Sequence, residues 1–398
     1  MRAPSQELSA LSEADLLRTL KTYRCADLPL VQNTEAQSFL NFSSNDYLGL
    51  SQHPALKEAA ITAITQQGTG ATASRLVCGT YDYHRALENK IAQLKQTDDA
   101  LLFANGYTTA LGTITALLGK EDTIILDKLS HASLIDAARL SGAHLRVFPH
   151  NNLNRLEEIL KATRDKSKPN TRVIVVTESV FSMDGDLCPL PEIIALKKQY
   201  DALLFLDEAH ALGVLGPQGL GLAEALGLQQ EVDLQMGTLG KAAGSAGGYL
   251  AAEQSLIDLL VNKARSFIYS TAPPPAQVAS ASAAFDIITS AEGASLREKL
   301  RNHLSLLHSS CKDSSLNTEP WTLETPILPL ILGNNDSALS ASQALRAKGF
   351  LVPAIRYPTV PKNTARLRIT LSAAHSAPQI QSLAEALTFG FASKEEIR

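Results

Sequence analysis

The chain has 398 residues, of which 45% are apolar and 19% are charged. This length can bury a large core and predicts two or three domains, or one large α/β domain with a smaller addition. The formal net charge is −4, and the sequence has neither a basic block nor an acidic tail. The charge therefore argues against nucleic acid or an anionic membrane as a partner.

The four cysteines are scattered along the chain, without a CxxC pair or a regular spacing. They predict neither a disulfide framework nor a zinc site, so we expect no metal and a reducing compartment. The first residues lack the apolar core of a signal peptide. The uncharged stretch 100–119 contains Asn105, glycines and threonines, which favours strand, turn and helix over a membrane span. We therefore expect a soluble, cytoplasmic protein.

Apolar spacing over residues 10–24 predicts an N-terminal helix. From about residue 53, helical periodicity alternates with short apolar runs that are typical of strands buried on both faces, which predicts a mostly parallel sheet. The short loop before 247–252 allows that last strand to be antiparallel. The predicted helices are 54–66, 83–95, 108–118, 131–141, 154–164 and 190–200. The predicted strands are 100–104, 123–127, 145–149, 172–179, 203–208, 233–239 and 247–252.

The alternation stops after TAPPPAQVA (271–279), and the remaining pattern predicts a smaller α+β domain. We expect residues 1–50 to join this smaller domain, residues 51–283 to form a large domain, and residues 284–398 to form the smaller one. The predicted elements of the last part are helices 276–290, 293–309, 337–348 and 376–388, with strands near 327–332 and 366–371.

Two motifs suggest covalent chemistry on a lysine amine. In TLGKAAGSAGG (238–248), Lys241 follows a strand among small residues, a pattern that also fits a solvated lysine in a glycine-rich turn. In LLFLDEAHALG (203–213), Asp207 ends an apolar strand, where open α/β sheets bind ligands. A carboxylate buried there needs a cation or a proton donor, for which a pyridinium nitrogen is suited. The alternative is an aspartate that caps the following turn.

Other strand ends carry polar groups as well. Asn105 and Gly106 precede a helix whose N–H groups could bind phosphate. His131 begins a helix, where it could stack on a flat ring or serve as a cap. The loop after 172–179 carries Glu178, Ser182 and Asp184, and Arg366 and Arg368 alternate on a late strand, as a grip on a substrate carboxylate requires. A nicotinamide dehydrogenase would need GxGxxG after the first strand and an acid about 20 residues later, and no segment satisfies both conditions.

The order of these motifs resembles that of the α-oxoamine synthases, a family of pyridoxal 5'-phosphate enzymes. The resemblance covers nearly the whole chain. It implies an α/β fold-type I transferase with a large, mostly parallel seven-stranded sheet domain, a smaller α+β domain and a homodimer. The motifs that carry it are NFSSNDYLGL (41–50), SRLVCGT (74–80), LSHASL (129–134), VFSMDGD (180–186), DEAH (207–210), GTLGKA (237–242), IYSTAPPPA (268–276) and ARLRITLSAAH (365–375).

The resemblance also implies catalytic roles. Lys241 would carry pyridoxal 5'-phosphate as a Schiff base and later remove the Cα proton of the amino acid. Asp207 would pair with the ring nitrogen, His131 would stack on the ring, and His210 would hydrogen-bond its phenolic oxygen.

Further cofactor contacts would come from Gly106, Tyr107, Ser182 and Thr238, and Thr271 would reach the phosphate of the neighbouring subunit. For the substrates, Arg368 would bind the amino-acid carboxylate, Asn45 would lie close to it, and Thr359 would lie along the path of the acyl thioester.

NFSSNDYLGL, YST before prolines and RYPTVP (356–361) favour the family member that acts in biotin biosynthesis. That acyltransferase condenses L-alanine with pimeloyl-CoA or pimeloyl-acyl-carrier protein and releases CO₂ and the free thiol. CGT at 78–80 is nearer to glycine C-acetyltransferase (2-amino-3-ketobutyrate CoA ligase), which stays an alternative, as does a non-catalytic partner subunit of the same fold. Two departures stand out. Asn105 replaces the usual Ser or Cys, and the family's N-terminal arginine could be Arg18 or Arg24.

Overall fold

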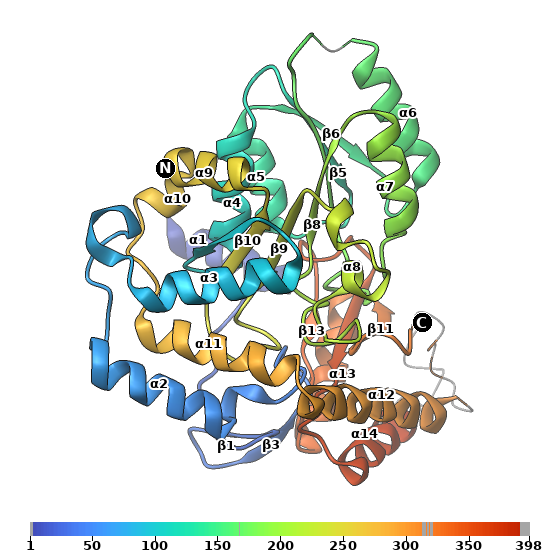
Figure 1. The fold of residues 1–398 in the computed structure, drawn as a ribbon. Coiled ribbons are helices and arrows are strands. Elements are labelled where there is room, and N and C mark those ends of the chain that lie inside the picture. Colours follow the sequence, from blue (N-terminus) through green and yellow to red (C-terminus); the bar gives the residue numbers. More distant parts are fainter. Residues whose placement is uncertain (1–2, 167, 313–315, 317, 319–320, 391–398) are drawn as a thin grey trace. The chain divides into compact units, whose positions relative to one another are not determined.

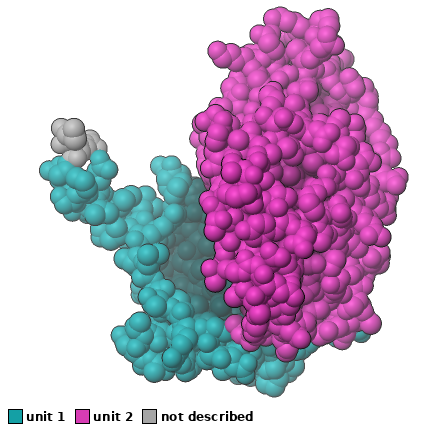
Figure 2. All heavy atoms as spheres, turned by 60° about the vertical axis from the view of Figure 1, so that its left-hand side comes forward, with its two compact units in different colours: residues 1–49, 183–186, 298–398 teal, residues 50–182, 187–297 magenta. Residues whose placement is uncertain are grey.

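The computed structural model describes residues 3–166, 168–312, 316, 318 and 321–390. Packing divides the chain into two compact units, coloured separately in Figure 2. Unit 1 comprises Met1–Gly49, Met183–Asp186 and Glu298–Arg398, and unit 2 comprises Leu50–Ser182 and Leu187–Arg297. The domain boundaries expected at residues 50 and 283 stay predictions.

A seven-stranded sheet forms the centre of unit 2, with the order β4-β10-β9-β8-β7-β5-β6 (Figure 1). β10 pairs antiparallel with both β4 and β9, while β5 to β9 pair in parallel. The mostly parallel sheet with an antiparallel last strand is therefore confirmed. The strands are β4 (Asp99–Phe103), β5 (Thr123–Asp127), β6 (His144–Phe148), β7 (Val173–Glu178), β8 (Leu203–Asp207), β9 (Leu234–Thr238) and β10 (Gly248–Ala252).

Helices cover both faces of this sheet, because its strands are apolar on both sides. One core packs α4, α5, α9 and α10 on one face, and two more cores pack α3 and α11, and α6 and α7, on the other. The helices of this unit are α2 (Pro54–Gln67), α3 (Asp82–Lys95), α4 (Gly106–Leu117), α5 (Ala132–Ser141), α6 (Leu153–Arg164), α7 (Leu190–Gln199), α8 (Leu222–Ala225), α9 (Gln254–Lys263), α10 (Arg265–Ile268) and α11 (Pro275–Ile288).

Unit 1 joins the two ends of the chain through two small sheets, ordered β1-β2-β3-β12 and β11-β14-β13. β3 pairs in parallel with β12, so that Leu40 lies opposite Phe350. The strands are β1 (Tyr23–Asp27), β2 (Leu30–Asn33), β3 (Ser38–Asn41), β11 (Ile327–Gly333), β12 (Phe350–Leu351), β13 (Ala354–Ile355) and β14 (Ala365–Thr370). The helices are α1 (Pro4–Glu13), α13 (Asn335–Ala347), α14 (Ala377–Gly390) and α12 (Ala291–Cys311), which begins in unit 2.

The predicted helix over residues 10–24 is wrong. The helix is α1 (Pro4–Glu13), with a proline in its first turn, and it stops before Asp15, which adopts a left-handed φ of 54°. Residues 23–27 instead form β1 and pair with β2. The leucines at 11, 16, 17 and 20 have the spacing of an apolar helix face, but the residues after them form a strand because they pair with β2. Among the described helices, none has both the length and the apolar character needed to cross a membrane.

Candidate active site

Three neighbouring strands of the large sheet end in acidic residues. β5 ends at Asp127, β7 at Glu178 and β8 at Asp207, and these strands are adjacent in the order β8-β7-β5. Glu178 and Asp207 are paired residues in the parallel ladder, and all three acids are buried. The carboxyl edge of an open α/β sheet is where such folds bind ligands, so this row marks the candidate site.

Asp207 is a buried carboxyl group with few partners of its own. Its Oδ1 accepts a hydrogen bond from the backbone N–H of Ala209 at 2.8 Å, and the described residues provide no ion pair to it. Burial raises the pKa of Asp207, and the nearby Lys241 amine acts in the opposite sense. A carboxylate in this setting is costly unless a cation meets it, and a protonated ring nitrogen satisfies that need.

Lys241 lies in the turn that connects β9 to the antiparallel β10. Leu239 N donates to Gly247 O at 3.0 Å, and Gly244 N donates to Lys241 O at 2.9 Å, which fixes the turn. Gly244 has a φ of +60°, and a Cβ there would lie 2.5 Å from Ser51 N, so the turn requires glycine. The amine Nζ lies 2.7 Å from Nε2 of His210. The structure thus brings together Lys241 and His210, beside the end of β8.

His131 is placed at the same edge by the start of α5. Its backbone N–H donates to Oε1 of Glu178 at 2.5 Å, and its Nδ1 lies 2.8 Å from Oγ of Ser133. The residue is exposed. The protein atoms around the imidazole, and to a lesser degree the Lys241 amine, lower the pKa of His131, whereas the Asp207 carboxyl raises it. A neutral imidazole held at its backbone and at one ring nitrogen can present its face to a flat ligand.

The helix start expected to bind phosphate lies close to the end of β9. A Cβ on Gly106 would lie 3.6 Å from Oγ1 of Thr238, so these two predicted residues are neighbours. Asn105 is the N-cap of α4 and accepts from Thr108 N at 2.9 Å. The departure at Asn105 therefore leaves a normal cap. In the described chain, the N–H groups of Gly106 and Tyr107 donate to no protein acceptor, as an anion site at a helix start requires.

The remaining predicted cofactor residues are less tightly grouped. The hydroxyl of Tyr107 donates to Asp136 at 2.5 Å, and 44% of the residue is exposed. Ser182 is buried at the end of the segment that follows β7. Thr271 is exposed and forms an isolated bridge with Ser74.

Unit 1 contains the predicted group for an amino-acid carboxylate. Arg368 lies on β14, 5% exposed, and its Nη1 donates to Oδ1 of Asn45 at 3.1 Å and to Oγ1 of Thr370 at 2.9 Å. Tyr47 also donates to Oδ1 of Asn45, at 3.2 Å, and burial raises the pKa of Tyr47 to about 12 although Arg368 opposes the shift. The other strand arginine, Arg366, forms an ion pair with Asp184. Arg368 is thus the arginine that Asn45 and Tyr47 surround.

The structure also separates the two candidate N-terminal arginines. Nη2 of Arg18 donates to Oγ1 of Thr359 at 3.3 Å, whereas Arg24 donates to Gln32 on the neighbouring strand. Arg18 and Arg356 line a hollow of about 430 Å³ within unit 1. Its other lining residues are Leu17, Thr19, Lys21, Tyr23, Leu339, Ser342, Arg346, Phe350, Leu351, Val352, Pro353 and Ala354.

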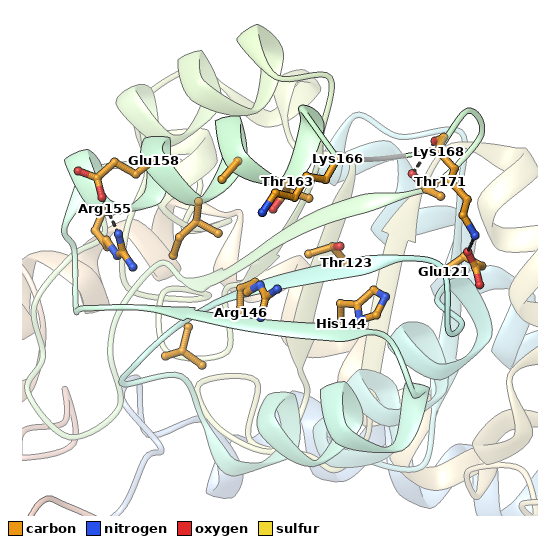
Figure 3. Close-up of a pocket in the computed structure, with 13 residues that line it drawn as sticks. Glu121, Thr123, His144, Arg146, Arg155, Glu158, Thr163, Lys166, Lys168 and Thr171 are labelled. Carbon is orange, nitrogen blue, oxygen red and sulfur yellow. Dashed lines mark hydrogen bonds and ion pairs between the residues drawn. The ribbon is translucent and has the colours of Figure 1, made fainter.

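A larger hollow of about 670 Å³ lies elsewhere, between α6 and the edge strand β6 (Figure 3). It runs along β6 from His144 to Val147 and is also lined by Thr123 at the start of β5. Two ion pairs form among its lining residues, Arg155 with Glu158 and Lys168 with Glu121, each at 2.6 Å. None of the predicted site residues lines this hollow.

Sequence reasoning noticed Glu178 as a polar group after a strand but gave it no role, and it did not single out Asp127 or Tyr47. The signal for the two acids was present, because each is the last residue of an apolar strand, as Asp207 is. Tyr47 gave no comparable signal, because its hydroxyl interacts with Arg368, which lies 321 residues later in the chain.

Comparisons with known proteins agree with this geometry. The family model of class I and II aminotransferases matches residues 37–387. The 8-amino-7-oxononanoate synthase of Geobacter sulfurreducens is 44% identical over 97% of this chain and 97% of its own length, and that of Citrifermentans bemidjiense is 42% identical over 96% and 97%.

Solved structures show the same fold. A serine palmitoyltransferase variant from S. paucimobilis, with bound PLP, has a TM-score of 0.88 and 28% identity, covering 97% of this chain and 96% of its own. An 8-amino-7-oxononanoate synthase from Francisella tularensis has a TM-score of 0.75 and 27% identity, covering 88% and 97%.

Pyridoxal 5'-phosphate fits the residues that are present. Asp207 supplies a buried carboxylate for a ring cation, Lys241 an amine that can form a Schiff base, and the start of α4 supplies N–H groups for a phosphate. The chain belongs to the class I and II aminotransferase family and, within it, to the pyridoxal-phosphate-dependent 8-amino-7-oxononanoate synthases.

Proposed function

We propose that this enzyme condenses L-alanine with a pimeloyl thioester to give 8-amino-7-oxononanoate, CO₂ and the free thiol, in biotin biosynthesis. The observation that carries the proposal is the pair formed by Lys241 and His210, 2.7 Å apart, beside the buried carboxyl of Asp207. The names of the relatives support the product. The two substrates are inferred from its carbon skeleton.

When bound, pyridoxal 5'-phosphate supplies an electron sink for the charge that develops at Cα of the amino acid. Lys241 holds the cofactor and then takes the Cα proton on its amine, and proton transfer by a positioned group typically accelerates a step by about 10²- to 10⁴-fold. His210 orients that amine through its Nε2, and the buried carboxyl of Asp207 would pair with the ring nitrogen. His131 would lie against the flat face of the ring.

The substrates are assigned to residues of unit 1. Arg368 binds the alanine carboxylate with its guanidinium, which Asn45 and Thr370 orient. Arg18 and Thr359 bind the acyl donor, because the hydrogen bond between them supports Arg18 over Arg24 for this role. The hollow of about 430 Å³ beside Arg18 combines apolar side chains with Lys21, Arg346 and Arg356, which suits a chain that ends in a carboxylate.

A homodimer in the cytoplasm belongs to the same proposal. Thr271 supports it, because this predicted cofactor residue is exposed and forms a bridge with Ser74. Such a residue can serve the site of a second copy. Sedimentation of the purified protein tests the dimer.

The reaction is tested by giving the purified enzyme either L-alanine or glycine with each of three donors, pimeloyl-CoA, pimeloyl-acyl-carrier protein and acetyl-CoA. Mass spectrometry of the amino ketone and release of labelled CO₂ from carboxyl-labelled amino acid give the readout. Turnover confined to alanine with a pimeloyl donor supports the proposal. Preference for glycine with acetyl-CoA contradicts it and indicates the glycine C-acetyltransferase that CGT at 78–80 resembles.

A further inference from the structure

Glu178 occupies the middle of the row of three acids at the carboxyl edge of the sheet. β7, which ends at Glu178, lies between β8 and β5, which end at Asp207 and Asp127. Glu178 lies opposite Asp207 in the ladder and is 2% exposed. Neighbouring strands are about 4.8 Å apart, so the side chains of Glu178 and Asp207 are adjacent, whereas Asp127 lies one residue out of register with Glu178 and points to the other face of the sheet.

Both outer acids accept hydrogen bonds from backbone N–H groups. The side chain of Asp127 accepts hydrogen bonds from Leu129 N at 2.8 Å and Asn151 N at 2.9 Å, and it meets Nδ1 of His150 at 3.0 Å. Asp207 accepts from Ala209 N and lies near the Lys241 amine.

Glu178 has a different partner. Its Oε1 accepts the backbone N–H of His131 at 2.5 Å, and the carbonyl oxygen of a neutral carboxylic acid can also accept such a bond. Two other buried glutamates each form an ion pair, Glu88 with Arg75 and Glu208 with Lys95. No ion pair to Glu178 occurs among the described residues.

We propose that Glu178 is the uncharged acid of this row and a positioning residue, which holds His131 in place through its backbone and leaves the negative charge of the pair on Asp207. Two carboxylates on paired positions of adjacent strands repel each other, and sharing one proton between them removes that repulsion. The inference rests on the proposed function only in naming the cation that Asp207 then meets.

The groups that face Glu178 support this assignment. Burial raises the pKa of Glu178 well above its usual value, and Asp207 and Asp127 raise it further. The Lys241 amine and the N–H of His131 lower it by less. These directions favour the protonated form of Glu178, in agreement with its burial and its place opposite Asp207.

The experiment uses the cofactor-free full-length enzyme, labelled with [δ-¹³C]glutamate, in an infrared measurement at pH 7. A neutral Glu178 gives the carbonyl stretch of a protonated carboxylic acid, shifted by the label and lost in Glu178→Gln. Absence of that band from the wild-type protein overturns the proposal, whether or not the variant folds. Because neither cofactor nor substrate is present, failure here is distinct from failure of the proposed reaction.

Binding of pyridoxal 5'-phosphate, followed by tryptophan fluorescence, then tests the positioning role. Glu178→Gln keeps a neutral carbonyl acceptor, so its Kd stays within about threefold of the wild type. Glu178→Ala loses the contact to His131 and weakens binding about tenfold or more, and Asp207→Asn does the same by removing the anion. A Glu178→Gln variant as weak as Asp207→Asn would show that Glu178 works as an anion, which overturns the proposal.

Discussion

The amine of Lys241 and the imidazole of His210 meet at 2.7 Å, although Lys241 lies in the β9–β10 turn and His210 follows β8. The contact fixes the direction of a long, flexible side chain at the edge of the sheet. It gives the lysine a nitrogen partner that can exchange a proton with it, as a residue that alternates between nucleophile and base needs.

Replacing Lys241 by Ala removes the amine that holds the cofactor. We expect product formation to fall below detection and the visible absorbance of the covalently held cofactor to disappear. Absorption spectra and the product assay measure both effects, with Lys128→Ala, an exposed lysine at another strand end, as the control. A Lys241→Ala enzyme with normal absorbance and turnover would contradict the assignment.

Replacing Arg368 by Lys keeps the positive charge but removes the planar fork that can grip a carboxylate with two hydrogen bonds. We expect the KM for alanine to rise about ten- to a hundredfold, because a hydrogen bond to a charged group is lost. The KM for the acyl donor should change little. Steady-state kinetics with each substrate varied separately show the split. Equal changes in both constants would count against a specific grip on alanine.

Arg18 and Arg24 form a matched pair of arginines in the same N-terminal segment. Arg18→Ala removes the donor to Thr359 and should raise the KM for the pimeloyl donor about tenfold, whereas Arg24→Ala, which loses a contact to Gln32, should leave it near the wild-type value. Initial rates at fixed alanine give the comparison. The reverse order of the two variants would move the acyl role to Arg24.

Lys95 and Glu208 form a completely buried ion pair that ties α3 to the segment following β8. Lys95 also donates to Leu220 O at 2.8 Å, and Glu208 accepts from Ala223 N at 2.9 Å. Lys95→Met leaves a buried charge without its partner and should lower the free energy of unfolding by about 3–5 kcal/mol.

The double variant Lys95→Met with Glu208→Gln removes both charges and should recover a large part of that loss. Urea unfolding of the three proteins measures it. A double variant no more stable than Lys95→Met would show that packing, and not the unpaired charge, causes the loss.

His375 makes stability depend on pH. It is buried and stacks on Phe42 with ring centroids 4.1 Å apart, and burial lowers the pKa of His375 to about 4. Between pH 6.5 and 4 the unfolded chain binds a proton that the folded chain does not, so stability falls as the pH falls through this range.

His375 lowers the free energy of unfolding by an amount on the order of 3 kcal/mol once the pH is below its folded-state pKa. Urea unfolding at pH 7, 6 and 5 should show a shallower decline in His375→Gln than in the wild type. Parallel declines in the two proteins would assign the pH dependence to other groups.

Much of the large sheet could be predicted from sequence because its strands are apolar on both faces and its helices separate them regularly. β8 and β10 are examples, since LLFLD and GGYLAA contrast sharply with the segments around them. The N-terminal region could not be predicted in this way. Tyr23–Asp27 is an exposed, polar strand that exists because β2 pairs with it, and such pairing leaves little trace in the segment itself.

The candidate site shows the same division. Lys241, Asp207 and His131 could be named because each follows a strand end or begins a helix with a recognisable motif. The row formed by Asp127, Glu178 and Asp207 could not, because the order of strands in the sheet differs from their order in the chain. Only the structure shows that Glu178 lies between the other two.

The pairing of β3 with β12 has a consequence for synthesis of the chain. Leu40 leaves the ribosome early, but its partner strand at Phe350 follows about three hundred residues later, and at 5–20 residues per second β3 waits for about 15 to 60 seconds. In the sequence, all residues of unit 2 come between Leu40 and Phe350, so its seven-stranded sheet can be completed once β10 has been synthesised. The edge of β3 that faces β12 therefore forms its hydrogen bonds late, and loss of the final fifty residues would leave β3 paired with β2 alone.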